Sequence, residues 1–231
     1  MRKTVLDRGL YPTVIPAVNP TDGKTPLNQR YSVDMKLIKA QCDKTFAAES
    51  SINFVQFAEL VDQSQDLKNQ VGARVYINVH NRGVLVASQI RVRVLISTCI
   101  GSTAPVAPTA NNKTPDPKPP RLPDNYWVNL ANNQPIPRPS DNNPGWYDIG
   151  EIEINQLMAG LPKVVSLDVD PCKLPRVGQY VVLALVSHFR DPYDSQERDV
   201  DQLILTYRKA AMTYVTVKPK PQSVVINPFP G

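Results

Sequence analysis

The stretch RVYINVH, residues 74–80, decides the fold class of this chain. Its aliphatic residues at 75, 77 and 79 alternate with tyrosine, asparagine and histidine at 76, 78 and 80. A period of two is typical of a strand that has one face in a core. The turn signal Asn81-Arg82-Gly83 follows, and residues 88–97 repeat the alternation with aliphatic side chains at 90, 92, 94 and 96 and arginines at 91 and 93. The two segments are predicted to be neighbouring antiparallel strands.

Further strand signals surround this pair. Alternating or continuous apolar runs occupy residues 146–154, 164–169, 180–187 and 212–217, and upstream strands are predicted at 31–40 and 52–61. Short strands separated by turn signals, without long intervening helices, favour an all-β fold, an Ig-like antiparallel sandwich. One short helix is expected within 199–211, where Val200, Leu203, Ile204 and Tyr207 have helical spacing behind the candidate N-caps Asp199 and Asp201.

Proline divides the rest of the chain. Residues 1–32 form a Pro-punctuated N-terminal arm, 33–217 form the sandwich domain, and 218–231 form a Pro-rich C-terminal arm. Within the domain, residues 101–145 hold 11 of the 23 prolines, so this segment is expected to be a long loop and not a central strand. Its aromatic pair, Tyr126-Trp127, is expected to attach the loop to the sandwich.

Composition excludes several classes of protein. The 231 residues carry a net charge of +5 from scattered Lys and Arg, which argues against nucleic-acid binding. No apolar run reaches the roughly 18 residues of a membrane-spanning helix, and no signal peptide is recognised, so we expect a cytoplasmic protein or part of a particle released without a cleaved signal. Cys42, Cys99 and Cys172 lack metal-ligand spacing; three buried thiols are favoured, with one disulfide as the alternative.

The strand motifs are similar to a known family. Residues 75–83, VYINVHNRG, and 87–94, ASQIRVRV, resemble the opening strands of the bacterial CARDB-like Ig-type domains. Residues 148–151, 162–166, 180–192 and 210–217 resemble the family's later strands, so the resemblance covers roughly residues 50–217. It implies a non-catalytic sandwich used in adhesion or assembly.

Catalysis and metal binding have little basis in the sequence. His80 and His188 are the only histidines, and neither they nor Cys172 lies in a recognised catalytic or metal-ligand motif, so no enzyme and no cofactor is expected. The acidic loop at 191–201 offers hard oxygen ligands of the kind that calcium takes, although a helix-capping, salt-bridged loop is favoured. The calcium candidates are Asp191, Asp194, Asp199 and Asp201.

The leading functional hypothesis is a structural or interaction subunit. An apolar, Pro-spaced arm can add a strand to the sheet edge of a neighbour, which predicts a homo-oligomer or a larger assembly such as a surface filament or a phage or injection particle. The candidate anchors are Val5, Leu10, Tyr11, Val14 and Ile15 in one arm and Val224, Val225, Ile226 and Phe229 in the other. The alternative is a module that binds carbohydrate or a surface polymer by stacking on Tyr126, Trp127, Trp146 and Tyr147.

Overall fold

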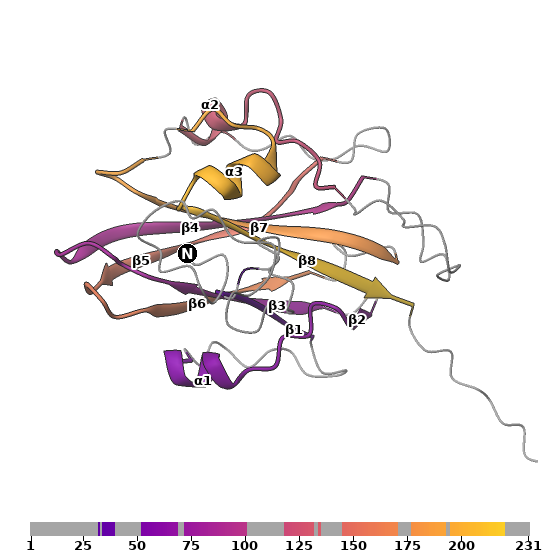
Figure 1. Cartoon of the computed structure of the whole chain (residues 1–231), viewed down its shortest axis with the longest axis horizontal. Helices are drawn as coiled ribbons and strands as arrows, with labels where there is room; N and C mark the ends of the chain where they lie inside the picture. The colour runs from indigo at the N-terminus through magenta and orange to yellow at the C-terminus, as the bar shows by residue number, and fades with distance from the viewer. Residues whose placement is uncertain are drawn as a thin grey trace, which may run out of the picture.

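Two β-sheets form the body of the protein (Figure 1). The computed structural model describes residues 32, 34–39, 52–68, 72–100, 118–131, 134, 145–170, 177–192 and 195–219. A three-stranded sheet has the order β1-β3-β6, and a five-stranded sheet has the order β2-β8-β7-β4-β5. All pairings are antiparallel except that of β2 with β8. The strands are β1 (Met35–Lys39), β2 (Leu67–Lys68), β3 (Ala73–Val79), β4 (Ala87–Thr98), β5 (Tyr147–Leu157), β6 (Lys163–Val169), β7 (Gly178–His188) and β8 (Ala210–Lys218).

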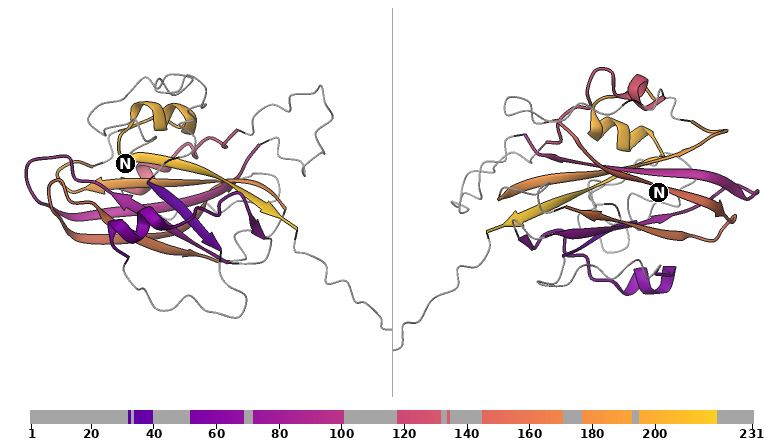
Figure 2. Two further views of the ribbon diagram at one scale, coloured as in Figure 1. Left: turned by 60° about the horizontal axis from the view of Figure 1, so that its bottom comes forward. Right: turned by 180° about the vertical axis from the view of Figure 1, so that it is seen from behind.

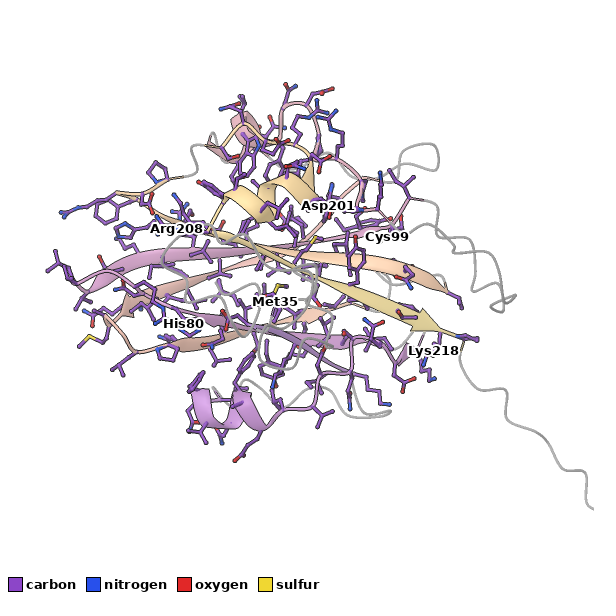
Figure 3. The ribbon with its side chains drawn as sticks, viewed as in Figure 1. Met35, His80, Cys99, Asp201, Arg208 and Lys218 are labelled. Carbon is purple, nitrogen blue, oxygen red and sulfur yellow. The ribbon has the colours of Figure 1, made fainter. Side chains whose placement is uncertain are left out.

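The sheets pack face to face over a shared apolar core. Met35 of β1 lies between them (Figure 3), and the aliphatic residues of β3 meet those of β4, β7 and β8 there. Alternation explains this, because every second side chain of each strand points to the same face. The fully buried members from the central strands include Val75, Ile77, Val92, Val94, Ile96, Val182 and Val215.

A second apolar cluster covers the outer face of the five-stranded sheet. The helices α2 (Tyr126–Ala131) and α3 (Val200–Thr206) lie on this face, as Figure 1 and the right view of Figure 2 show. The odd-numbered residues of β7, from 181 to 185, point into this cluster, whereas the even-numbered ones point into the core between the sheets. The five-stranded sheet is therefore buried on both faces over its central strands.

The outer face of the three-stranded sheet is polar. Arg74 of β3 forms a bidentate salt bridge with Asp168 of β6, with Nε–Oδ1 and Nη2–Oδ2 distances of 2.6 and 3.1 Å. The short helix α1 (Phe54–Glu59) lies on this side, and Lys36 of β1 donates to the carbonyl oxygens of Phe57 and Leu60 in and after it. In the described part of the chain, no helix has the length and apolarity to cross a membrane.

The all-β prediction is confirmed at the level of two sheets with few helices. Strands occupy the predicted segments around residues 74–80, 88–97, 146–154, 164–169, 180–187 and 212–217, and β1 lies within 31–40. Helix α3 begins after Asp199, which caps it by accepting from the backbone N–H of Gln202.

Three expectations were wrong. β3 and β4 are not hydrogen-bonded neighbours, because the connection between them crosses from one sheet to the other, and both apolar faces still meet in the core. Residues 54–59 of the expected strand at 52–61 form α1, which begins with a reciprocal pair of hydrogen bonds between Asn53 and Gln56. Part of the long loop at 101–145 is the helix α2.

Candidate interaction site

The arms themselves lie largely outside the described residues. This applies to all nine candidate anchors, from Val5 to Ile15 and from Val224 to Phe229, so their contacts stay predictions. At the C-terminal boundary, Lys218 belongs to β8 and not to an arm. The described residues do show which sheet edges a strand could reach.

One side of the sandwich is closed by the chain itself. At the edge of β1, the backbone N–H of Leu37 donates to Oδ1 of Asp62 at 2.9 Å, and the N–H of Gln63 donates to the carbonyl oxygen of Leu37 at 2.8 Å. At the edge of β8, the N–H of Ser32 donates to Met212 and the N–H of Thr216 donates to Ser64, at 3.0 and 2.8 Å. These contacts occupy the main-chain groups that an incoming strand would need.

An ionic cluster holds this closed side together. The carboxylate of Asp66 lies 3.4 Å from Nζ of Lys39, 3.3 Å from Lys68 and 3.1 Å from Lys218. These lysines belong to β1, β2 and β8, so the cluster joins both sheets. The hydrogen bond from Lys218, followed by those from Lys68 and Lys39, lowers the pKa of Asp66 to about 2.

The opposite side is formed by β5 and β6, the end strands of the two sheets. β5 pairs with β4 and β6 pairs with β3, and among the described residues no strand pairs with the second edge of either. The register of β5 shifts opposite Val94 and Leu95, and Gly150 there has a φ of 151°. A Cβ on Gly150 would lie 3.3 Å from Leu167 of β6, so this bulge brings β5 close to β6. Beyond the bulge, residues 152–157 pair with β4 on one side only among the described residues.

The two histidines lie at the ends of strands from different sheets, His80 directly after β3 and His188 as the last residue of β7. Nε2 of His80 lies 3.2 Å from Oδ1 of Asp34 and 3.0 Å from Nδ2 of Asn78. Asp34 and Asn78 are fully buried, and the amide of Asn78 also donates to Asp34 at 3.3 Å. His188 ends β7, and its Nδ1 accepts from the backbone N–H of Arg190 at 3.2 Å. Both histidines thus serve local hydrogen bonding, and Cys172 lies outside the described residues.

The aromatic residues proposed for stacking are largely covered. Trp146 is 1% exposed and Trp127 is 7% exposed, and Tyr126 is fully buried, while Tyr147 is partly buried against the core between the sheets. The indole N–H groups of Trp127 and Trp146 donate to the carbonyl oxygens of Glu197 and Arg121 at 2.9 and 3.3 Å. Burial of these rings disfavours stacking on a polymer, and it agrees with the expectation that Tyr126-Trp127 attaches its segment to the sheet.

A groove of about 420 Å³ lies beside this aromatic cluster. It lies between α2, the first part of β4, the middle of β5 and the end of β7, and was not anticipated from the sequence. Arg91, which lines the groove, lies 3.8 Å from Glu151 of β5, and the next arginine of β4, Arg93, lies 3.6 Å from Asp148 of β5. Its lining residues are Gln89, Arg91, Trp127, Leu130, Glu151, Glu153, Ser187, His188, Phe189 and Pro192.

The described acidic residues of the 191–201 loop make structural contacts. Asp191 accepts from Nζ of Lys209 at 2.6 Å, Asp199 caps α3, and Asp201 lies in the first turn of that helix. Asp194 lies outside the described residues. No cluster of three or more His, Cys, Asp or Glu side chains suited to a metal occurs in the part of the chain that the structure describes. Cys99 is a buried thiol, and Cys42 and Cys172 are not described.

Comparison with known proteins identifies no family. No family model matches the chain, and no curated protein matches it. Among solved structures, a hemolymph-type prophenoloxidase from a crustacean is similar over 68% of this chain, with 6% identity and a TM-score of 0.30. The match spans 28% of the length of that protein, and a similarity this low assigns neither a fold family nor a function.

Proposed function

We propose that this protein is a non-catalytic interaction subunit, built on a CARDB-like Ig-type sandwich, that assembles with copies of itself or with a partner through its terminal arms. Each arm adds as a strand to the edge of β5, at residues 152–157, on a neighbouring molecule. Main-chain hydrogen bonds supply affinity in such an arrangement, and alternate side chains of the arm select the register.

The observation that carries this proposal is the asymmetry of the sheet edges. Residues 62–68 and Ser32 cover the edges of β1 and β8, whereas described residues leave the edges of β5 and β6 uncovered. An uncovered edge is a template for another strand, and natural proteins usually protect such edges. The bulge at Gly150 protects the first part of β5 but not residues 152–157.

A non-catalytic role is supported by the use of the polar side chains. His80, Asp34 and Asn78 contact one another, and the charged residues beside the groove pair across β4 and β5. These contacts give the groups a structural role.

Light scattering over a concentration series tests the proposal. The full-length chain is expected to exceed the 25.7 kDa mass of a monomer, and deletion of residues 220–231 is expected to lower that mass while leaving β8 and the Lys218–Asp66 contact intact. Val224→Asp with Ile226→Asp is expected to act like the deletion, and Ser223→Asp is the matched control that keeps the apolar run. A full-length protein that stays monomeric at every concentration would overturn self-assembly.

The docking edge is tested separately. A synthetic peptide of residues 219–231 is added to the truncated chain, and amide hydrogen exchange is followed along β5. Protection of the amides at 152–157 is expected. Protection confined to β1 or β8 would contradict the proposed edge.

A further inference from the structure

One end of the molecule exposes a group of large apolar side chains. The connections β3–β4 and β5–β6 meet at this end, at the left of Figure 1, and Figure 2 shows them side by side from other directions. Val84 is 92% exposed, Leu85 77% and Leu161 63%, and Val86 and Met158 are also exposed. Soluble domains seldom expose such a group without a use. We call residues 81–86 and 158–162 the apolar tips.

Hydrogen bonds hold the two tips in one arrangement. Nδ2 of Asn81 donates to the carbonyl oxygens of Leu85 and Leu157 at 2.7 and 2.9 Å. The backbone N–H of Gly160 donates to the carbonyl oxygen of Asn81 at 3.0 Å, which links the second tip back to the first. Gly160 has a φ of 74°, a conformation that glycine adopts without strain. The apolar side chains are thus presented outward by a defined backbone.

The charged residues within the two tip segments have one sign. No Asp or Glu occurs at residues 80–90 or 154–167, whereas Arg82 and Lys163 are exposed there. A neighbouring turn adds exposed Phe189 with Arg190, whose guanidinium carbon lies 5.2 Å from the ring centre. The acidic residue that follows, Asp191, is paired with Lys209 at 2.6 Å.

We propose that this end of the sandwich docks on a lipid bilayer that carries anionic headgroups. The aliphatic side chains of the tips enter the boundary between headgroups and acyl chains, and Arg82, Lys163 and Arg190 contact the headgroups. The tips carry apolar side chains at their ends and basic side chains beside them. This arrangement suits the boundary between headgroups and acyl chains, where burial of apolar side chains and attraction to anionic lipids both favour binding.

This inference does not depend on assembly through the arms. Lys218, at the end of β8, lies toward the opposite end of the molecule from His80, which precedes the first tip (Figure 3). Docking by the tips therefore leaves the end of β8 directed away from the bilayer.

Vesicle flotation with the full-length protein tests the proposal. The protein is expected to float with vesicles of phosphatidylcholine mixed with phosphatidylserine. Leu85→Ser combined with Leu161→Ser is expected to lower the partition coefficient at least about tenfold, since burial of a single leucine is worth roughly that factor. The matched control is Val61→Ser, because Val61 is 75% exposed but lies outside the tips.

Charge and depth are measured in the same system. Arg82→Gln with Lys163→Gln is expected to remove the preference for phosphatidylserine over pure phosphatidylcholine. Tryptophan at position 85, introduced as Leu85→Trp, is expected to be quenched by brominated lipid, and Val61→Trp is not.

Two results would overturn the proposal. One is a wild-type protein that does not float with phosphatidylserine vesicles, and the other is a double-serine variant that floats as well as wild type. If vesicles are not bound and the double-serine variant instead has a lower mass in light scattering, the tips form a contact between copies of the chain.

Discussion

The side-chain amide of Asn81 donates to the carbonyl oxygen of Leu157 at 2.9 Å, and this bond joins the β3–β4 connection to the end of β5. The same nitrogen donates to Leu85, and Oδ1 accepts from the backbone N–H of Gly83 at 2.9 Å. One side chain therefore satisfies backbone groups at the β3–β4 connection and at the start of the β5–β6 connection, two of the places where the chain crosses between the sheets.

Asn81→Ala is expected to lower the free energy of unfolding by about 1–3 kcal/mol, because it removes three hydrogen bonds that each contribute about 0.5–1.5 kcal/mol net. Asn81→Asp retains the acceptor for the N–H of Gly83 but loses the amide that donates to Leu85 and Leu157. Comparison of the two variants therefore separates the donated hydrogen bonds from the accepted one. Urea denaturation measures the loss, and hydrogen exchange is expected to rise in residues 81–86. An unchanged denaturation midpoint in both variants would show that the tips do not depend on this residue.

Asp66 provides a prediction on pH. The pKa of Asp66 in the folded protein is about 2, below the ordinary value of about 4. The ionised carboxylate therefore stabilises the folded state above about pH 4, and this stabilisation is lost as the pH falls toward 2. Asp66→Asn is expected to have a lower Tm than wild type near neutral pH, and the two values are expected to converge near pH 2.

Salt is the control for this prediction. The carboxylate of Asp66 is half exposed, so added salt is expected to screen its contacts and to shrink the difference in Tm at neutral pH. If the difference in Tm between wild type and Asp66→Asn stays the same at pH 2 or in high salt, it arises from lost packing and not from charge.

Much of the strand content was predictable because alternation is a local property. β3, β4 and β6 begin and end within about two residues of the segments read from the sequence. The helix α1 also had a local signal, since Asn53 and Gln56 have the spacing of a capping box, but the apolar run around them favoured a strand.

Partner choice between strands could not be read in the same way. β3 paired with β4, or facing it across the core, would bury the same aliphatic residues, so the alternation does not distinguish the two arrangements. The covered edges at β1 and β8 depend on contacts such as Thr216 with Ser64, more than 150 residues apart. The apolar run at 84–86 was visible in the sequence, but only the fold brings it beside residues 158–161.

Tyr126 carries a buried hydroxyl that has no hydrogen-bond partner among the described residues. Tyr126→Phe is therefore expected to leave the free energy of unfolding unchanged or to raise it by up to about 1 kcal/mol, since it removes a polar group that is buried at a cost. Thermal denaturation of the two proteins measures this. A clear loss of stability would mean that the hydroxyl has a partner in solution.

Alkaline pH gives a second measurement on the same variant. Burial, with a smaller contribution from Asp148 and Glu151 against the opposing effect of Arg93, raises the pKa of Tyr126 well above its ordinary value. In the unfolded chain the Tyr126 hydroxyl ionises at about pH 10, whereas in the folded chain it stays protonated at that pH. The free energy of unfolding of the wild-type protein is therefore expected to fall above pH 10. In Tyr126→Phe, the fall in stability that comes from this hydroxyl is expected to be absent.

Trp146 gives the sharpest separation of a core role from a binding role. Its ring is almost completely buried against the cluster beneath α2 and α3, and its Nε1 donates to the carbonyl oxygen of Arg121 at 3.3 Å. Trp146→Ala is expected to lower the free energy of unfolding by about 3–5 kcal/mol, the range for removal of a large buried aromatic side chain. Trp146→Phe retains most of the apolar volume and is expected to lose less. Urea denaturation of both variants tests this order. If Trp146→Ala is as stable as wild type, the indole has no core role and is again a candidate for ligand binding.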